Sequence, residues 1–193
     1  RRMNSAARYD VQGMVVVVMG GTSGLGLSGS RCLVEQGARV VVCSRSESKV
    51  AAAVESLGAN CRGLAGDAAD SGTAEKAVAL AVAEFGRLDA LYHVAGGSGR
   101  ARGDGPVHEL TDEGWRYTTE LNLSSVVFSN RAAIRQFLAQ GGGGCVLNTS
   151  SVLGWSPSPE FFASHAYAAA KAGIIGFSKS AASYYAKDNV RVN

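Results

Sequence analysis

The sequence predicts an α/β protein in which helices cover both faces of a parallel sheet, the doubly wound class. Short runs that are apolar throughout, beginning with VVVVM at 15–19, recur along the chain, as is typical of strands buried on both faces. Longer segments with apolar residues at helical spacing separate these runs, and this alternation favours a parallel sheet. Because no linker, repeat or change of composition interrupts it, we expect one domain over 11–193 after an N-terminal tail of residues 1–10.

End residues delimit the elements expected in the first half. The helix at 25–37 ends on Gly37, a good C-terminal stop, and the helix at 46–58 begins on serine and closes on glycine. NCRGLAGD is a weaker strand, and the helix that follows it, SGTAEKAVALAVAEFG, is well patterned. Strands are therefore expected here at 15–19, 38–45 and 60–67, a strand running into a glycine turn at 88–97, and helices at 25–37, 46–58 and 71–86.

A long polar loop opens the second half. The stretch 111–140 then predicts one short and one long helix, and 144–151 a strand. A long helix at 164–187 and the start of a sixth strand at 189–193 complete the pattern.

Charge and hydropathy exclude several classes of protein. The net charge is only +3 and no block of basic residues occurs, so we expect no nucleic-acid or membrane partner. The longest apolar run near the start, Met14 to Met19, is far shorter than the roughly 20 residues that a membrane span needs. The first ten residues also lack the apolar middle of a secretion signal.

The cysteines indicate a reducing compartment. They are far apart, form no CxxC and lie mostly among apolar residues: Cys32, Cys43, Cys61 and Cys145. We therefore interpret them as small buried side chains rather than disulfides or metal ligands, and expect a cytoplasmic protein with no metal site.

A glycine-rich turn follows the first strand in MGGTSGLGLSG. A literal GxGxxG begins at Gly24, but a dinucleotide-binding turn needs its first glycine directly after the strand, which favours GxxxGxG on Gly20, Gly24 and Gly26. Glycine permits positive φ and close approach to a pyrophosphate, and a helix starting near Leu25 would present free N–H groups to it. Tight packing alone is the alternative reading of this turn.

The end of the second strand indicates which dinucleotide would bind. An acidic residue there would bind the ribose hydroxyls, but Ser44 and Arg45 occupy the place. A guanidinium pairs well with a 2′-phosphate, so we expect NADP(H) rather than NAD, unless Arg45 is a solvated loop residue.

Tyr167 and Lys171 lie four residues apart in a predicted helix and therefore share one face. A tyrosine has an unperturbed pKa of about 10, and a neighbouring ammonium stabilises its phenolate. The polar stretch from Asn148 to Ser151 ends the preceding strand, at the sheet edge where we expect the cofactor.

These motifs together resemble the short-chain dehydrogenase/reductase family, over nearly the whole chain from about Val11. The resemblance implies a Rossmann-type fold, with Ser151 of SVLG, Tyr167, Lys171 and Asn122 of LNLSS as catalytic residues. It also implies that Asp67 and Ala68 contact the adenine and that Ala95–Gly96 forms a turn at the cofactor. The cofactor-binding residues expected in all are Gly20, Thr22, Ser23, Gly24, Leu25, Gly26, Ser44, Arg45, Asp67, Ala68, Ala95 and Gly96.

The sequence departs from the family pattern at three places. Met19 stands where the family usually has threonine, and His93 stands where it commonly has asparagine; we interpret His93 as a structural replacement. The family continues beyond a segment like NVRVN with a substrate lid and a last strand, which we expect this chain to lack.

The resemblance implies an oxidoreductase that interconverts a carbonyl and a secondary alcohol. Tyr167 would donate or accept the proton, Ser151 would bind the oxygen, and Asn122 would hold a water in a relay to Lys171. YAAAKAGIIGFSKS resembles the carrier-protein ketoreductases, so β-ketoacyl thioester reduction is the first hypothesis and dehydrogenation of a sugar or cyclic alcohol the second.

Other readings remain open. The chain could be an NADPH-binding scaffold or redox sensor without turnover, whereas an epimerase of the related extended type would usually have GxxGxxG. Two insertions could contact the small-molecule substrate: Arg100 and Arg102 an acidic one, and Phe161 and Phe162, with His165 near the site, an apolar one, although ordinary loop roles are favoured for both. In the resembled family the helices matching 120–140 and 164–187 pair between subunits, so we expect a homodimer or homotetramer.

Overall fold

The computed structural model describes residues 10–193, so most of the expected tail lies outside the described residues. Its sheet has six strands, all parallel, in the order β3-β2-β1-β4-β5-β6. The strands are β1 (Val15–Met19), β2 (Arg39–Ser44), β3 (Cys61–Ala65), β4 (Ala90–His93), β5 (Gly144–Asn148) and β6 (Val190–Val192). The helices are α1 (Gly24–Glu35), α2 (Glu47–Leu57), α3 (Ser71–Phe85), α4 (Asp112–Thr119), α5 (Ser125–Gln140) and α6 (His165–Tyr185). This confirms the doubly wound α/β class.

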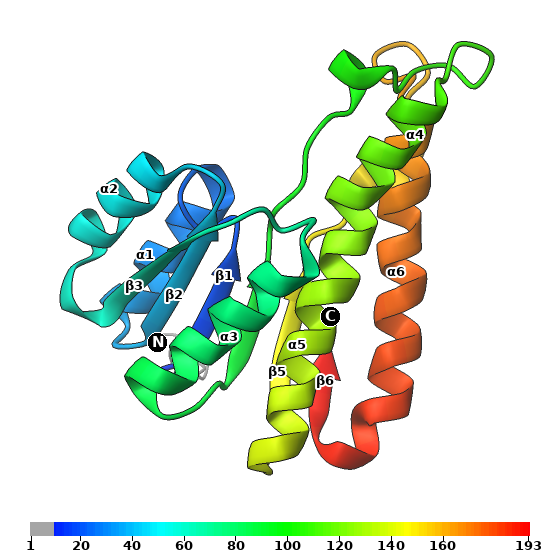
Figure 1. The fold of residues 1–193 in the computed structure, drawn as a ribbon. Helices are drawn as coiled ribbons and strands as arrows, with labels where there is room; N and C mark the ends of the chain where they lie inside the picture. The colour runs from blue at the N-terminus through cyan, green and yellow to red at the C-terminus, as the bar shows by residue number, and fades with distance from the viewer. Residues whose placement is uncertain (1–9) are drawn as a thin grey trace, which may run out of the picture.

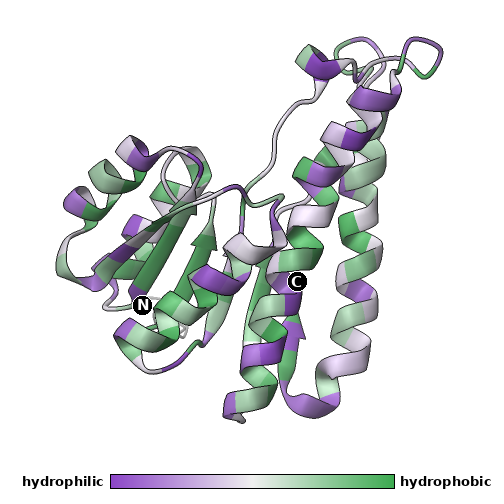
Figure 2. Cartoon of the chain, viewed as in Figure 1, coloured by the Kyte–Doolittle hydropathy of each residue, from purple (hydrophilic) through white to green (hydrophobic). Residues whose placement is uncertain are grey.

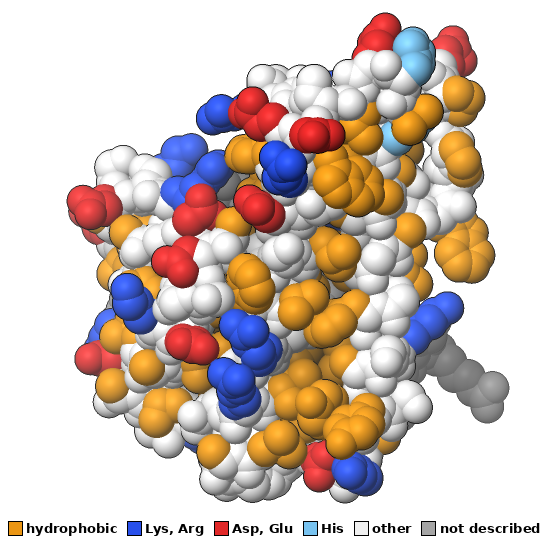
Figure 3. Space-filling model, turned by 45° about the vertical axis from the view of Figure 1, so that its right-hand side comes forward, with side chains coloured by type: hydrophobic (Ala, Val, Ile, Leu, Met, Phe, Trp, Pro, Cys, Tyr) orange, Lys and Arg blue, Asp and Glu red, His pale blue; other side chains and the backbone are white. Residues whose placement is uncertain are grey.

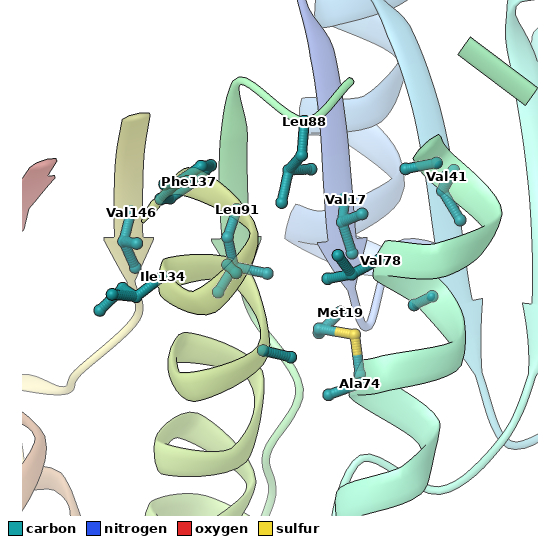
Figure 4. Close-up of a cluster of buried hydrophobic side chains, with 14 of the residues drawn as sticks. Val17, Met19, Val41, Ala74, Val78, Leu88, Leu91, Ile134, Phe137 and Val146 are labelled. Carbon is teal, nitrogen blue, oxygen red and sulfur yellow. The ribbon is translucent and has the colours of Figure 1, made fainter. Parts of the chain in front are cut away.

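The sheet separates two apolar cores because successive side chains of a strand point to opposite faces. Val16 and Val18 of β1 pack in the core beneath α1 and α2. Val17 and Met19 of the same strand point the other way, toward α3 and α5, where Figure 4 shows them with Val78 and other side chains. The strands that carry both cores are the most hydrophobic elements in Figure 2.

Local signals explain where several elements start and stop. The Ser46 hydroxyl caps α2 by accepting from the Lys49 N–H at 3.4 Å, and the Asp70 carboxylate caps α3 by accepting from the Gly72 N–H at 2.9 Å. Gly86 ends α3 in the left-handed conformation with φ of 83°. The polar cap residues and terminal glycines thus mark these boundaries.

Helices α4 and α5 form one continuous column beside α6 (Figure 1), joined by a π-helical segment at Glu120–Ser124. Here the Ser125 N–H donates to the Glu120 carbonyl, five residues back. Two side chains bond carbonyls of this wide turn: the Asn122 amide bonds Thr118 O at 2.9 Å, and the Ser125 hydroxyl bonds Leu121 O at 2.7 Å.

Some sequence expectations differ from the structure. The strand expected at 144–151 ends earlier, at Asn148, because the polar residues after it leave the sheet, whereas the strand expected to run into a glycine turn at 88–97 ends at His93, before that turn. The expectation that all four cysteines are buried is wrong for Cys32, which is exposed on α1, and Cys145 is only partly buried. All four thiols are free.

Candidate active site

Two cavities lie at the carboxyl ends of the strands. They are neighbours, since Gly96 lines one of them and the next residue, Gly97, lines the other. The first, the glycine-turn cavity, has a volume of about 210 Å³. The second, the tyrosine cavity, has a volume of about 360 Å³. Eight of the expected cofactor residues line the first cavity: Gly20, Ser23, Ser44, Arg45, Asp67, Ala68, Ala95 and Gly96.

The turn after β1 requires glycine at two positions. Gly20 has φ of 87°, and a Cβ there would lie 2.7 Å from the Ala95 nitrogen. A Cβ on Gly26 would overlap the carbonyl oxygen of Gly20. Only residues without a side chain therefore let the start of α1 lie against the end of β1.

The first turn of α1 carries free donors. Its N-cap residue, Ser23, makes no side-chain capping hydrogen bond, so no side chain occupies the helix N-terminus. Gly24 and Gly26 shape the turn without lining the cavity, Thr22 is buried beneath it, and the Leu25 side chain is exposed. A buried turn that ends in an uncapped helix N-terminus suits an anionic group such as a pyrophosphate.

The far end of the glycine-turn cavity is formed where β2 and β3 end. The exposed Arg45 makes no salt bridge to an acidic side chain within residues 10–193. Asp67 accepts a hydrogen bond from the Ala69 N–H at 3.0 Å, and its second oxygen stays available. Cys43, which the sequence analysis did not assign to the site, also lines this cavity; burial and the charge of Asp67 raise the pKa of its thiol to about 12.

Ser151 and Tyr167 line the tyrosine cavity together. Ser151 follows β5 and caps a short turn, Val152–Gly154, by accepting from the Leu153 N–H at 3.2 Å. Tyr167 lies in the first turn of α6. A strand end and a helix start thus bring the two hydroxyl-bearing side chains to one cavity.

Lys171 lies one turn beyond Tyr167 and is buried. Its ammonium donates to the Thr149 carbonyl at 2.8 Å and lies 5.7 Å from the centre of the Tyr167 ring. Burial lowers the pKa of Lys171 below its usual value. The cation therefore sits beneath the tyrosine rather than in solvent.

Asn122 joins the two cavities. Its amide bonds both main-chain groups of Gly97, accepting from N–H at 3.0 Å and donating to the carbonyl at 2.9 Å. A Cβ on Gly96 would lie 2.7 Å from the Asn122 oxygen and 3.4 Å from the Lys171 nitrogen, so both polar groups flank this glycine. Asn122 thereby fixes the wall that the cavities share.

His93 has a structural environment. Its Nδ1 lies 2.7 Å from the Ser129 hydroxyl, and its Nε2 lies 3.1 Å from the Ala95 carbonyl and 3.3 Å from the Ser125 hydroxyl. Burial, together with the charge of Lys171, lowers the pKa of His93 to about 3. The imidazole is neutral near pH 7 and ties β4 to α5.

The expectation that Asn148 to Ser151 would all lie at the cofactor needs correction. Asn148 is buried and exchanges amide hydrogen bonds of 2.8 and 3.0 Å with Asn130. The Ser150 hydroxyl bonds the Lys171 carbonyl at 2.7 Å. Ser151 alone of this stretch lines the tyrosine cavity, and none of the four residues lines the glycine-turn cavity, because the Asn148 side chain points toward α5 and the Ser150 side chain toward α6.

The loop after β4 fixes the start of α6. The buried Asp104 carboxylate accepts from the Ala166 N–H at 3.0 Å and from the Tyr167 N–H at 3.1 Å. It therefore caps the tyrosine-bearing helix from a segment more than sixty residues away. Asp104 could not be identified from the sequence, since nothing near it in the chain marks it as the cap of α6.

The glycine-turn cavity has the features of a phosphate-binding turn, and the tyrosine cavity brings two hydroxyl groups to one space. Glycine is required beneath the first, and its uncapped helix N-terminus is ready for a phosphate. Within residues 10–193 no cluster of three metal-ligating side chains occurs. No helix in that part of the chain is long and apolar enough to span a membrane. Fold and site define a dinucleotide-dependent oxidoreductase.

Comparison with known proteins identifies the family. The model of the short chain dehydrogenase family matches residues 14–193, so the chain belongs to that family of NAD(P)-dependent oxidoreductases. It is 36% identical over 181 residues to cis-4-hydroxycyclohexanecarboxylate dehydrogenase of Sinomonas cyclohexanicum, covering 93% of this chain and 70% of that one. It is 34% identical to the 3-oxoacyl-acyl-carrier-protein reductase of Escherichia coli (strain K12), covering 94% and 71%. A crystal structure of a short chain dehydrogenase from Mycobacterium smegmatis superposes with a TM-score of 0.88 at 29% identity, covering 96% and 77%.

Proposed function

We propose that the chain is an NADP(H)-dependent oxidoreductase that interconverts a carbonyl and a secondary alcohol. The observation that carries this proposal is the tyrosine cavity, where Ser151 and Tyr167 face one space above the buried ammonium of Lys171. The bound nicotinamide supplies or accepts the hydride.

The protein's own groups manage the oxygen and its proton. In the reducing direction the Ser151 hydroxyl donates a hydrogen bond to the carbonyl oxygen, and the Tyr167 hydroxyl transfers its proton to the same atom. Lys171 stabilises the phenolate that remains, because its positive charge lies 5.7 Å from the ring. In the oxidising direction the phenolate removes the proton.

Asn122 completes the proposed site as a positioning residue. It fixes Gly97 through two hydrogen bonds and lies next to Gly96, which Lys171 also approaches. In this proposal a water held beside Asn122 extends the proton path from Lys171.

Arg45 supports NADP(H) over NAD. It lies at the end of β2 on the glycine-turn cavity, with Ser44 beside it and no acidic partner within the described residues. A forked guanidinium suits a 2′-phosphate, whereas an acidic residue there would favour a bare ribose.

We propose two substrate classes, ranked by the support for each. β-Ketoacyl thioesters come first, supported by the YAAAKAGIIGFSKS match and by the 34% identity to a 3-oxoacyl-acyl-carrier-protein reductase. Cyclic alcohols come second, supported by the 36% identity to a dehydrogenase of a hydroxycyclohexanecarboxylate and by the apolar wall of Val152, Leu153 and Phe162 in the tyrosine cavity. Reduction of acetoacetyl-CoA compared with oxidation of cyclohexanol distinguishes the two classes.

We also propose a homodimer or homotetramer formed through α5 and α6. Hydrophobic side chains gather on the face turned forward in Figure 3, and a groove between these helices is lined by Leu138, Phe177 and Tyr184. Light scattering of the purified protein measures its oligomeric state.

We also propose a cytoplasmic location, which the free thiols of the four cysteines support.

The cofactor assignment is tested by titrating the protein with NADPH and NADH. We expect tighter NADPH binding and, for Arg45→Asp, a loss of about tenfold or more for NADPH with little change for NADH, because a charge-assisted hydrogen bond to phosphate is lost. Arg31→Asp, an exposed change of equal charge on α1, is the control. Equal losses in both variants would contradict the assignment.

The catalytic assignment is tested by Tyr167→Phe. We expect turnover to fall by about a thousandfold or more, because the proton donor is lost, while NADPH affinity stays within about twofold. Tyr117→Phe, on α4 and in the lining of neither cavity, should keep full turnover. A protein that acts as a scaffold or sensor would instead keep its function in the Tyr167 variant.

A further inference from the structure

Arg100 forms part of the tyrosine cavity although it comes from the loop after β4. Its Nε donates to the Ser164 hydroxyl at 2.8 Å, and its Nη2 donates to the Phe161 carbonyl at 3.1 Å. The guanidinium also lies 5.5 Å from the centre of the Phe162 ring. Three contacts, one of them to the buried Ser164, therefore hold this cation at the cavity wall.

Arg100 is exposed and also borders a second cavity, which Asp104 and Glu160 line, but neither carboxylate is close enough to form a salt bridge with it. No carboxylate of residues 10–193 forms a salt bridge with it, and its Nη1 donates to none of these residues. Arg102, two residues further on, is different: it pairs with Glu113 at 3.4 Å, stacks on Tyr117 and lies away from the cavity. The two arginines of one short loop thus have opposite environments.

The rest of the cavity wall carries no charged side chain. Val152, Leu153 and Phe162 give it an apolar surface, and Gly97 keeps it open. Ser151 and Tyr167 are the groups that would bind the reacting oxygen. A ligand that satisfies the whole cavity has an apolar body, with an oxygen at Tyr167 and a negative group at Arg100.

We propose that Arg100 is a specificity-determining residue that binds a carboxylate carried by the substrate. The inference rests on the proposed carbonyl–alcohol chemistry, because it places the carboxylate and the reacting oxygen of one molecule in the same cavity. It favours the second substrate class, cyclic alcohols, over β-ketoacyl thioesters, whose acyl group carries no carboxylate. The N–H groups of Nη1 and the remaining N–H of Nη2 donate to the carboxylate oxygens, while Ser164 and Phe161 accept from Nε and Nη2 and hold the guanidinium.

A matched pair of substrates tests the inference by turnover. With NADPH, we compare kcat/KM for 3-oxocyclohexanecarboxylate with that for its uncharged carboxamide, in the wild type and in Arg100→Gln. We expect the wild type to prefer the acid by about tenfold or more, the range of one charge-assisted hydrogen bond, and Arg100→Gln to lose this preference. Arg102→Gln, which removes the same charge two residues away, should keep it.

A binding measurement separates this inference from the proposed function. Calorimetry of the NADP⁺-saturated protein with cyclohexanecarboxylate and cyclohexanecarboxamide needs no turnover, and we expect the acid to bind about tenfold tighter only while Arg100 is present. Acid-selective binding without turnover of any carbonyl would support the carboxylate site and contradict the proposed function. Equal effects of Arg100→Gln and Arg102→Gln would overturn the inference. Loss of both acid and amide binding in Arg100→Gln, with Arg100→Lys keeping amide binding but not acid preference, would still support it.

Discussion

The two halves of the site are built by different means. The glycine-turn cavity is made largely of backbone: Gly20 and Gly26 bring β1 and α1 together, and few side chains are needed to hold the turn. The tyrosine cavity depends on side chains that reach across long stretches of sequence. Asp104 caps α6, and Arg100 bonds Ser164, each across more than sixty residues.

This difference determines how each half responds to change. A backbone turn fails when atoms are added, because there is no room for a Cβ. A cavity held by side-chain hydrogen bonds fails when atoms are removed, because buried groups then lose their partners. Additions should therefore damage cofactor binding, and deletions should damage the placement of Tyr167.

The largest effect is expected for Gly26→Ala. The new methyl would overlap the Gly20 carbonyl, so the turn must open, and we expect the Kd for NADPH to rise by about a hundredfold or more. Gly176→Ala is the matched control, since a Cβ there meets no atom within 4 Å. It should raise the free energy of unfolding by up to about 1 kcal/mol, as alanine favours a helix. Unchanged NADPH affinity in Gly26→Ala would refute the backbone argument.

Asp104→Ala should cost less but affect the other half. Two N–H groups at the start of α6 lose their acceptor, so we expect the free energy of unfolding to fall by about 2 kcal/mol. Turnover should fall with it, because the first turn of α6 carries Tyr167, while NADPH affinity stays close to that of the wild type. Denaturant unfolding and steady-state kinetics measure these effects. Asp112→Ala, an exposed carboxylate in the first turn of α4, should change neither by much.

His93 is an exception to this comparison. It lies just before the glycines of the wall that the two cavities share, yet side chains of α5 hold it in place. Its folded pKa of about 3 is below the unfolded value, so between pH 3 and 6.5 the unfolded chain binds more protons. The free energy of unfolding therefore rises with pH through this window and falls as pH decreases. We expect this group to account for about 2 kcal/mol lost between pH 7 and pH 5.

Comparison with His93→Asn isolates that contribution. The variant should lose about 2 kcal/mol less than the wild type between the two pH values, measured by denaturant unfolding. His165→Asn, at an exposed position, serves as the control and should follow the wild type. Parallel curves for all three proteins would show that His93 is protonated in the folded state, contrary to its burial.

The sequence predicted the fold well because its signals are local. Apolar runs, caps such as Ser46 and stops such as Gly86 mark elements within a few residues, and the strand alternation specifies a parallel sheet. The glycine turn and the Tyr167–Lys171 spacing are equally local. The structure places Ser151 and Tyr167 on one cavity with Lys171 beneath, as their motif order suggested.

The remaining features could not be predicted because they depend on contacts between distant segments. Nothing in RARGD indicates that Asp104 would meet α6. The sequence offered both arginines as possible substrate contacts but could not predict that Arg100 would face the cavity while Arg102 faces Glu113. Asn148 looked like a ligand-binding residue but is used in an amide pair with Asn130, which becomes visible only when α5 packs on β5.

The π-helical segment at Glu120–Ser124 has a consequence for how the chain tolerates insertions and deletions. A wide turn holds more residues than an α-helical one, so deleting a single residue there would let the column close into a regular α-helix. A regular α-helical turn makes the same full rotation with about one residue fewer, so α4 would keep nearly the same direction relative to α5, whereas Asn122 would lose the position from which it bonds Gly97. The extra residue of the wide turn therefore matters for where Asn122 lies at the wall that the two cavities share, and not for the direction of the column.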